Sequence, residues 1–129
     1  PTQAGLSTEW WSVKLLDADE TGRSELAAQL LDKQRPGGGW GWLTDEPPNA
    51  LGTGQALYAL GRTGTSWNDP QIQSALTFLQ ETQTDDGSWT VPSTRKKDQL
   101  KVRETSTYFG TAWAVIGVLA LLPEPEAAP

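Results

Sequence analysis

Apolar residues recur along much of the chain at the spacing that marks one face of a helix. Two segments follow the i, i+3, i+4, i+7 rule and carry polar residues on the opposite side. The apolar positions are Leu26, Ala27, Leu30 and Leu31 in the first segment, and Ile72, Ala75, Leu76 and Leu79 in the second. The pattern predicts two amphipathic helices, each with one face in water.

Both of these helices begin at residues that favour helix N-termini. In the second segment, Asp69 suits the N-cap and Pro70 suits the first helical position. The first helix is expected to start within "ADETGRSE", at Asp19 or Thr21. Each amphipathic helix therefore has a predicted start as well as a predicted apolar face.

Two later segments are apolar on most sides and rich in Gly and Ala, and an earlier segment is interpreted as a member of the same class. They span residues 8–16, 51–60 and 109–118, and we expect them to form buried helices packed tightly on their neighbours. The longest apolar run, residues 108–122, contains 15 residues. Crossing a bilayer takes roughly 20 residues, so this run is interpreted as a buried core helix and no transmembrane segment is expected.

The loops between these segments repeat a pattern of Gln, Gly and Trp. When Gln34 is placed over Gln83, Gly38 falls on Gly87 and Trp40 falls on Trp89. The segments that follow also match, with Gly52 on Gly110, after about nine extra residues in the second copy. A fixed period of helix pairs is typical of helical repeat proteins, whose units cannot cover their apolar faces alone.

The predicted fold is all-α, with about five helices forming roughly two and a half antiparallel hairpins. We expect one domain over residues 1–122, with repeat units at 8–48 and 49–104 and a half unit at 105–122. Residues 123–129 have the Pro/Glu/Ala composition of a linker-like tail. Both ends of the chain suggest a domain cut from a longer polypeptide.

The strings "KQRPGGGW" and "QETQTDDGSW" resemble the QW motif of the triterpene cyclases and, more loosely, of the protein prenyltransferases. The likeness covers about residues 8–122 and implies an α/α toroid, with inner and outer rings of helices. In that family the Gln is thought to brace helix ends while the Trp stacks beside it. The resemblance therefore implies a structural role for Gln34, Gly38, Trp40, Gln83, Gly87 and Trp89.

Composition removes many kinds of chemistry from consideration. The chain has no Cys, Met or His, so it has no disulfide, no thiolate metal site and no histidine base. Its net charge of −6 argues against a nucleic-acid binder. The main basic run, residues 95–103, is interpreted as a solvated loop. Seven Trp residues are the outstanding feature of the composition.

This sequence lacks residues that the chemistry of the related families requires. The cyclases protonate an alkene with a D-x-D-D motif, and the nearest string, "DADE" at Asp17–Glu20, departs at its last position. We interpret it as a helix stop followed by an N-cap, and Thr84–Asp86 as a turn. The zinc site of prenyltransferases needs Cys and His. No catalytic residue, metal site or cofactor is therefore assigned, and the balance leans against an enzyme.

Aromatic side chains on the expected inner helices are the candidate ligand-binding residues. These are Trp10, Trp11, Tyr58, Tyr108, Phe109 and Trp113. In a closed toroid they would hold an apolar or cationic ligand against their ring faces, whereas the alternative is ordinary core packing. Trp42 and Trp67 are expected in loops or at helix ends, where they could stack on a sugar.

Three functions remain open at this point. The first is a non-catalytic repeat module of a larger protein, used for binding or assembly, whose open helix flanks favour a homo-oligomer. The second is a fragment of a squalene–hopene-like cyclase whose acid motif lies elsewhere in the parent chain. The third is a lipid- or glycan-binding module that uses the inner-helix aromatics.

Overall fold

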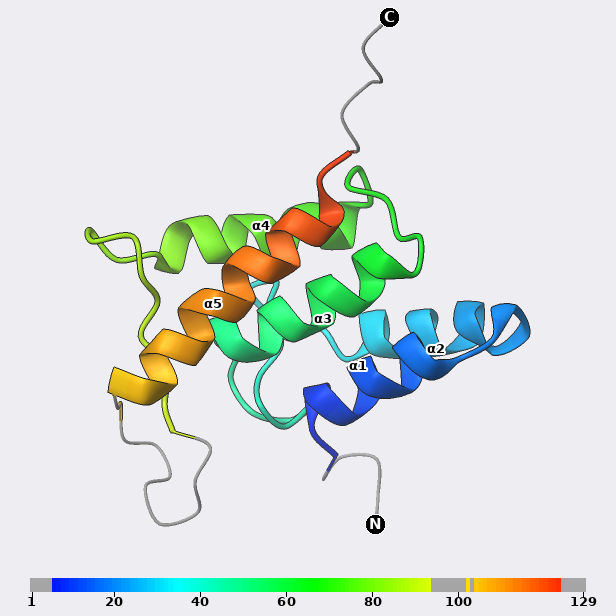
Figure 1. Cartoon of the computed structure of the whole chain (residues 1–129), viewed down its shortest axis with the longest axis horizontal. Coiled ribbons are helices and arrows are strands. Elements are labelled where there is room, and N and C mark those ends of the chain that lie inside the picture. The colour runs from blue at the N-terminus through cyan, green and yellow to red at the C-terminus, as the bar shows by residue number, and fades with distance from the viewer. Residues whose placement is uncertain (1–5, 94–101, 103, 124–129) are drawn as a thin grey trace, which may run out of the picture.

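The helices of the chain lie in the order that the sequence predicts. The structure, a computed structural model, describes residues 6–93, 102 and 104–123, and these hold five α-helices (Figure 1). They are α1 (Thr8–Asp17), α2 (Glu20–Asp32), α3 (Ala50–Arg62), α4 (Pro70–Thr82) and α5 (Glu104–Leu121). Over the same residues the β-pairing is limited to isolated bridges. The all-α prediction is confirmed.

Two segments singled out in the sequence fall largely beyond the described residues. Most of the basic run 95–103 is among them, as is the linker-like tail after Pro123. None of the helices in the described ranges is long and apolar enough to span a bilayer.

The helices form two sets that run in opposite directions. Helices α1, α3 and α5 run the same way, and α2 and α4 return between them (Figure 1). Helix α3 lies in the middle, because it packs extensively on α5 and also on α1. It is the most deeply buried helix, with Leu57, Ala59 and Leu60 fully covered. The row α1–α3–α5 matches the inner helices expected for a toroid fragment.

The helix starts follow from local capping chemistry. Asp69 caps α4 by accepting a hydrogen bond from the Gln71 N–H at 2.8 Å, and Pro70 is the first helical residue. Asp19 caps α2 by accepting from the Gly22 N–H at 2.9 Å. A side-chain oxygen at these positions satisfies a backbone donor that the helix itself leaves unpaired. The expected starts of both amphipathic helices are confirmed.

The contact between α3 and α5 depends on glycine. A Cβ added at Gly54 would lie 2.3 Å from the backbone carbon of Trp113, and one at Gly117 would lie 2.5 Å from the Gly54 carbonyl oxygen. Farther along, a Cβ at Gly61 would lie 2.7 Å from the Ala120 carbonyl oxygen. The two backbones approach so closely because Gly54 and Gly61 on α3 and Gly117 on α5 have no side chain at the contact.

The prediction of a buried core helix over residues 108–122 is wrong in part, because α5 is covered on one side only. Gly110, Ala114 and Gly117 are buried, whereas Tyr108 and Leu119 are exposed. The physical reason is that, among the helices the structure describes, α5 is the last in the row and α3 alone packs against it extensively. Helix α1, at the other end of the row, also has exposed apolar residues: Trp10, Val13 and Leu16.

The glycine contact leads to a prediction on stability. We expect Gly54→Ala to lower the free energy of unfolding by about 1–3 kcal/mol, because the added methyl group must push the backbone of Trp113 away. Gly22→Ala is the matched control, since its Cβ would meet nothing nearer than 3.7 Å in α2. Chemical denaturation followed by circular dichroism would compare them. Equal stability of Gly54→Ala and the parent would contradict the close-packing account.

Candidate functional site

The first Trp loop is joined to the next outer helix by a reciprocal pair of Gln side chains. The Gln34 amide nitrogen donates to the carbonyl of Gly38 at 2.6 Å and to that of Gln71 at 2.8 Å. In return, the Gln71 amide nitrogen donates to the Leu31 carbonyl at 3.0 Å and to Gln34 Oε1 at 3.1 Å. These bonds connect the end of α2, the loop and the start of α4.

Trp40 crosses the space between an outer helix and an inner helix. Its side chain is fully buried, and its indole N–H donates to the Leu30 carbonyl near the end of α2 at 2.8 Å. Its backbone N–H donates to Thr53 Oγ1 in α3 at 3.0 Å. The indole thus provides a large apolar contact while both donors of the residue are satisfied. One residue fixes α2, the loop and α3 relative to one another.

The second loop repeats these contacts 49 residues later (34 to 83, 40 to 89). Gln83 donates to the Gly87 carbonyl at 2.9 Å. The Trp89 indole N–H donates to the Leu79 carbonyl at 2.8 Å, and the Trp89 backbone N–H donates to Thr111 Oγ1 at 2.9 Å. Each donor and acceptor type matches its counterpart in the first loop. The Thr residues were not singled out in the sequence, although each follows directly after the aligned Gly52 or Gly110.

The two loops differ in one respect. Gln34 reaches across to Gln71 of α4, whereas the hydrogen bonding of the Gln83 side chain within the described residues is limited to Gly87. The Gln83 side chain is exposed. The first loop therefore joins two hairpins, while the second braces its own turn.

Glycine is required in both loops by backbone conformation. Gly38 has φ +107° and Gly87 has φ +89°, values that other residues rarely adopt. Gly38 also lies directly against α4, since an added Cβ would be 2.4 Å from the Ser74 carbonyl oxygen.

The acidic residues of the second loop organise a turn. Asp86 accepts hydrogen bonds from the hydroxyls of Ser88 at 2.6 Å and Thr84 at 2.5 Å, and from the Ser88 backbone N–H at 3.0 Å. The Ser88 and Thr84 hydroxyls stabilise the charged form and lower the pKa of Asp86 to about 2. This carboxylate is fully ionised near neutral pH and is unsuited to donating a proton.

The "DADE" segment also has a structural role at its centre. Helix α1 ends at Asp17, and Asp19 is the N-cap of α2. The interpretation as a helix stop followed by an N-cap is confirmed. In the part of the chain that the structure describes, no three carboxylates gather into a group that could hold a metal ion.

The six candidate ligand-binding aromatics form three separate edge-to-face pairs. The ring centroids lie 5.0 Å apart for Trp10–Trp11, 5.8 Å for Tyr58–Trp113 and 5.7 Å for Tyr108–Phe109. Lys14 and Lys33 place their ammonium groups 5.3 Å and 4.4 Å from the ring centroids of Trp10 and Trp11. The pairs differ in burial, since Trp11 is buried whereas Tyr108 is exposed.

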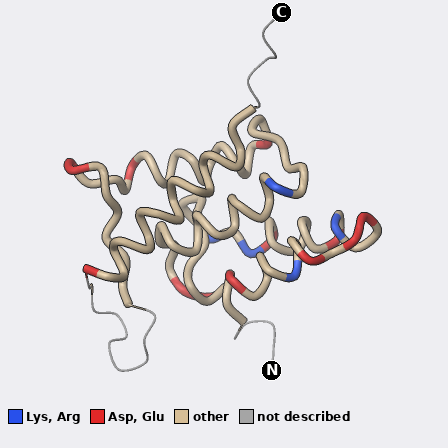
Figure 2. The backbone as a smooth tube through the Cα atoms, viewed as in Figure 1, with Lys and Arg blue, Asp and Glu red and all other residues tan. Residues whose placement is uncertain are grey.

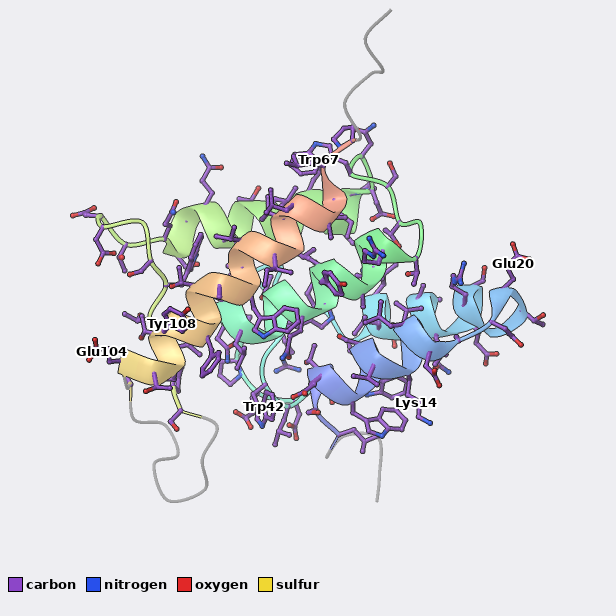
Figure 3. All side chains as sticks on the ribbon, in the orientation of Figure 1. Lys14, Glu20, Trp42, Trp67, Glu104 and Tyr108 are labelled. Atoms are coloured by element: carbon purple, nitrogen blue, oxygen red, sulfur yellow. The ribbon has the colours of Figure 1, made fainter. Side chains whose placement is uncertain are left out.

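A different set of aromatic residues surrounds a cavity of about 540 Å³. Trp42, Phe78 and Trp89 line it together with Pro47 and Pro48, between the two Trp loops. None of the six inner-helix aromatics contributes to this lining. Trp42 projects from the loop that leads into α3, and Trp67 lies at the opposite end of the helices (Figure 3). The sequence did not identify Phe78 as a candidate site residue, because an apolar residue within a helix is expected to pack in the core.

Comparison with known proteins agrees with this architecture. Residues 13–125 match the family model described as squalene-hopene cyclase C-terminal domain. No curated protein matches the chain.

The difference between the two loops generates a prediction with a control in the same chain. We expect Gln34→Leu to lower the free energy of unfolding by about 1–3 kcal/mol, because it removes the hydrogen bonds to the Gly38 and Gln71 carbonyls and the acceptor of the Gln71 amide. Gln83→Leu should cost less than about 1 kcal/mol, because Gln83 is exposed and, within the described residues, its side chain bonds the Gly87 carbonyl alone. Urea denaturation would compare them. Equal losses would show that the contact with α4 contributes nothing.

The hydrogen bonds to Asp86 predict its titration. We expect Ser88→Ala to raise the pKa of Asp86 from about 2 toward its ordinary value of 3.8, because the largest stabilising contact is removed. Because the pKa is depressed on folding, the stabilisation is present above about pH 4 and is lost as pH falls through about 2. NMR titration of the carboxyl carbon would measure the shift. Thr90→Ala is the control, and an unchanged pKa in Ser88→Ala would contradict the assignment.

Proposed function

The chain belongs to the squalene-hopene cyclase C-terminal domain family, and we propose that it is a non-catalytic repeat module that acts in assembly. The observation that carries this proposal is the uncovered apolar face of α5. The exposed fraction is 70% for Tyr108, 60% for Leu119 and 47% for Val115. Contiguous apolar surface of this kind typically marks a protein interface.

The electrostatics of α5 support the proposal. The sequence has no charged residue between Glu104 and Leu122, although the whole chain carries a net charge of −6. In the described ranges, the Lys, Arg, Asp and Glu residues lie outside residues 105–122, as Figure 2 shows. A surface helix that only faced water would be expected to carry charged residues on its outer side. The centres of protein interfaces are likewise depleted of charged residues.

The roles of the acidic residues favour a non-catalytic module over the cyclase alternative. Asp19 is occupied as an N-cap, and Asp86 accepts hydrogen bonds as an ionised carboxylate. A cyclase acid must instead be protonated when its substrate arrives. A cyclase function would therefore need an acid motif supplied from outside this chain.

Ligand binding is a second candidate, and one observation favours it. The cavity of about 540 Å³ between the loops has the size of a small-molecule site and is lined by Trp42, Phe78 and Trp89. Aromatic faces of this kind would suit a lipid chain or a sugar ring. Assembly ranks first because the apolar face of α5 runs along the whole helix.

Assembly is tested by the effect of charge on the α5 face. We expect the 129-residue chain to sediment as a species larger than a monomer, with a fraction that rises with concentration. Leu119→Lys should shift the chain to the monomer, because it buries a charge in the contact. Thr77→Lys, at an exposed position on α4, should leave association unchanged. A parent chain that stays monomeric at all concentrations would overturn the proposal.

A further inference from the structure

We infer that the cavity between the two Trp loops binds a small organic ammonium ion, whose apolar body packs on the aromatic rings and whose charge pairs with Glu46. This site lies outside the surface proposed for assembly, because none of its described lining residues belongs to α5. The described lining residues all lie between Trp42 and Ser93, so they form the site within one chain.

Three segments form the walls of the cavity. The loop that leads into α3 contributes Trp42 and Glu46, α4 contributes Phe78, and the second Trp loop contributes Trp89. Each wall therefore carries an aromatic ring. The volume of about 540 Å³ is within the range of sites that hold small molecules.

Two glycines of the first Trp loop let the walls come close together. A Cβ added at Gly39 would lie 2.9 Å from Phe78 Cδ2 and 2.8 Å from Pro48 Cβ, so both side chains pack directly on this glycine. A Cβ added at Gly41 would lie 2.7 Å from the Glu46 carbonyl oxygen. These contacts bring Phe78 of α4 and the Glu46–Pro48 segment onto the same short stretch of backbone.

Hydrogen bonds fix the walls on both sides of the cavity. In the loop that leads into α3, the Trp42 carbonyl accepts from the Thr8 N–H at 2.8 Å, and the Asn49 N–H donates to the Trp40 carbonyl at 3.0 Å. On the opposite wall, the indole and backbone N–H groups of Trp89 both donate to protein acceptors. A site that is already ordered loses little conformational entropy when a ligand binds.

Glu46 is the one charged residue among the described lining residues. Its side chain is partly buried, and within the described residues its carboxylate makes no hydrogen bond or ion pair. By contrast, the carboxylates of Asp19, Asp69 and Asp86 accept hydrogen bonds from neighbouring donors. An unpaired carboxylate in a partly desolvated cavity favours a ligand that brings a positive charge.

The aromatic rings favour the same sign of charge. The face of an aromatic ring attracts a cation, and the described residues already contain this contact: the Lys14 ammonium lies 5.3 Å from the Trp10 ring centroid, and the Lys33 ammonium lies 4.4 Å from that of Trp11. An ammonium ion with an aryl or alkyl body therefore suits both the rings and the carboxylate. An anion would be repelled by the carboxylate.

Three ligands of similar size and different charge test the inference: 2-phenylethylammonium, 2-phenylethanol and phenylacetate. We expect the ammonium ion to bind about fivefold more tightly than the alcohol, and phenylacetate to bind most weakly. Two-dimensional NMR of the indole N–H groups would measure binding at constant salt and near neutral pH. The Trp42 and Trp89 signals should shift, whereas the signal of Trp67, at the opposite end of the helices, should not (Figure 3).

Glu46→Gln removes the charge and nearly preserves the size of the side chain. It should reduce the preference for the ammonium ion over the alcohol to less than about twofold, and leave the affinity for the alcohol unchanged. Glu20→Gln is the matched control, because it removes the same charge at an exposed position far from Trp42 (Figure 3). Phe78→Leu keeps the wall apolar without a ring, and should weaken ammonium binding about twofold to threefold.

Four results would overturn the inference. They are no shift at Trp42 and Trp89 with any ligand, equal binding of the ammonium ion and the alcohol, an unchanged preference in Glu46→Gln, and tighter binding of phenylacetate. The last result would assign the site to the N-terminus of α3, which also borders the cavity at Asn49 and Ala50. Each of them would leave the assembly proposal standing, because the exposed residues of α5 do not line this cavity.

Discussion

The buried indole of Trp40 is the contact on which the arrangement of helices depends. It covers a large apolar area between α2 and α3, and it satisfies the Leu30 carbonyl at 2.8 Å. Carbonyls in the last turn of a helix lack their usual intrahelical donors. The Leu30 carbonyl accepts one hydrogen bond from the Lys33 backbone N–H at 3.1 Å, and the Trp40 indole supplies a second donor from the loop. This second bond allows the outer helix to end against the core. Trp89 makes the equivalent bond to Leu79.

The close packing of the inner helices follows from that arrangement. With the loops fixed, α3 and α5 meet along Gly54 and Gly117, where the two backbones nearly touch. The same geometry leaves α1 and α5 at the ends of the row, each with an apolar face in water. A repeat unit of this kind covers the apolar face of one neighbouring unit, and its own apolar face must be covered by another. The exposed face of α5 is therefore a consequence of the fold and the basis of its proposed function.

Polar residues in this chain mainly organise backbone. Asp19 and Asp69 cap helices, Asp86 holds a turn, and Gln34 with Gln71 joins two hairpins. Each side chain is committed to a nearby donor or acceptor, which lowers its capacity to change partners during a reaction.

The sequence by itself determined the all-α class, the order of the helices, their family and the caps at Asp19 and Asp69, because these follow from periodicity, motif and local chemistry. It also pointed to the Gln and Trp positions of the loops. Only the tertiary structure decided which carbonyls those side chains reach, that Thr53 and Thr111 complete the contacts, and that Phe78 lines a cavity. It also decided that α5 is covered on one side. An apolar segment indicates that a helix packs against other helices. The number of those neighbouring helices depends on the position of the helix in the row.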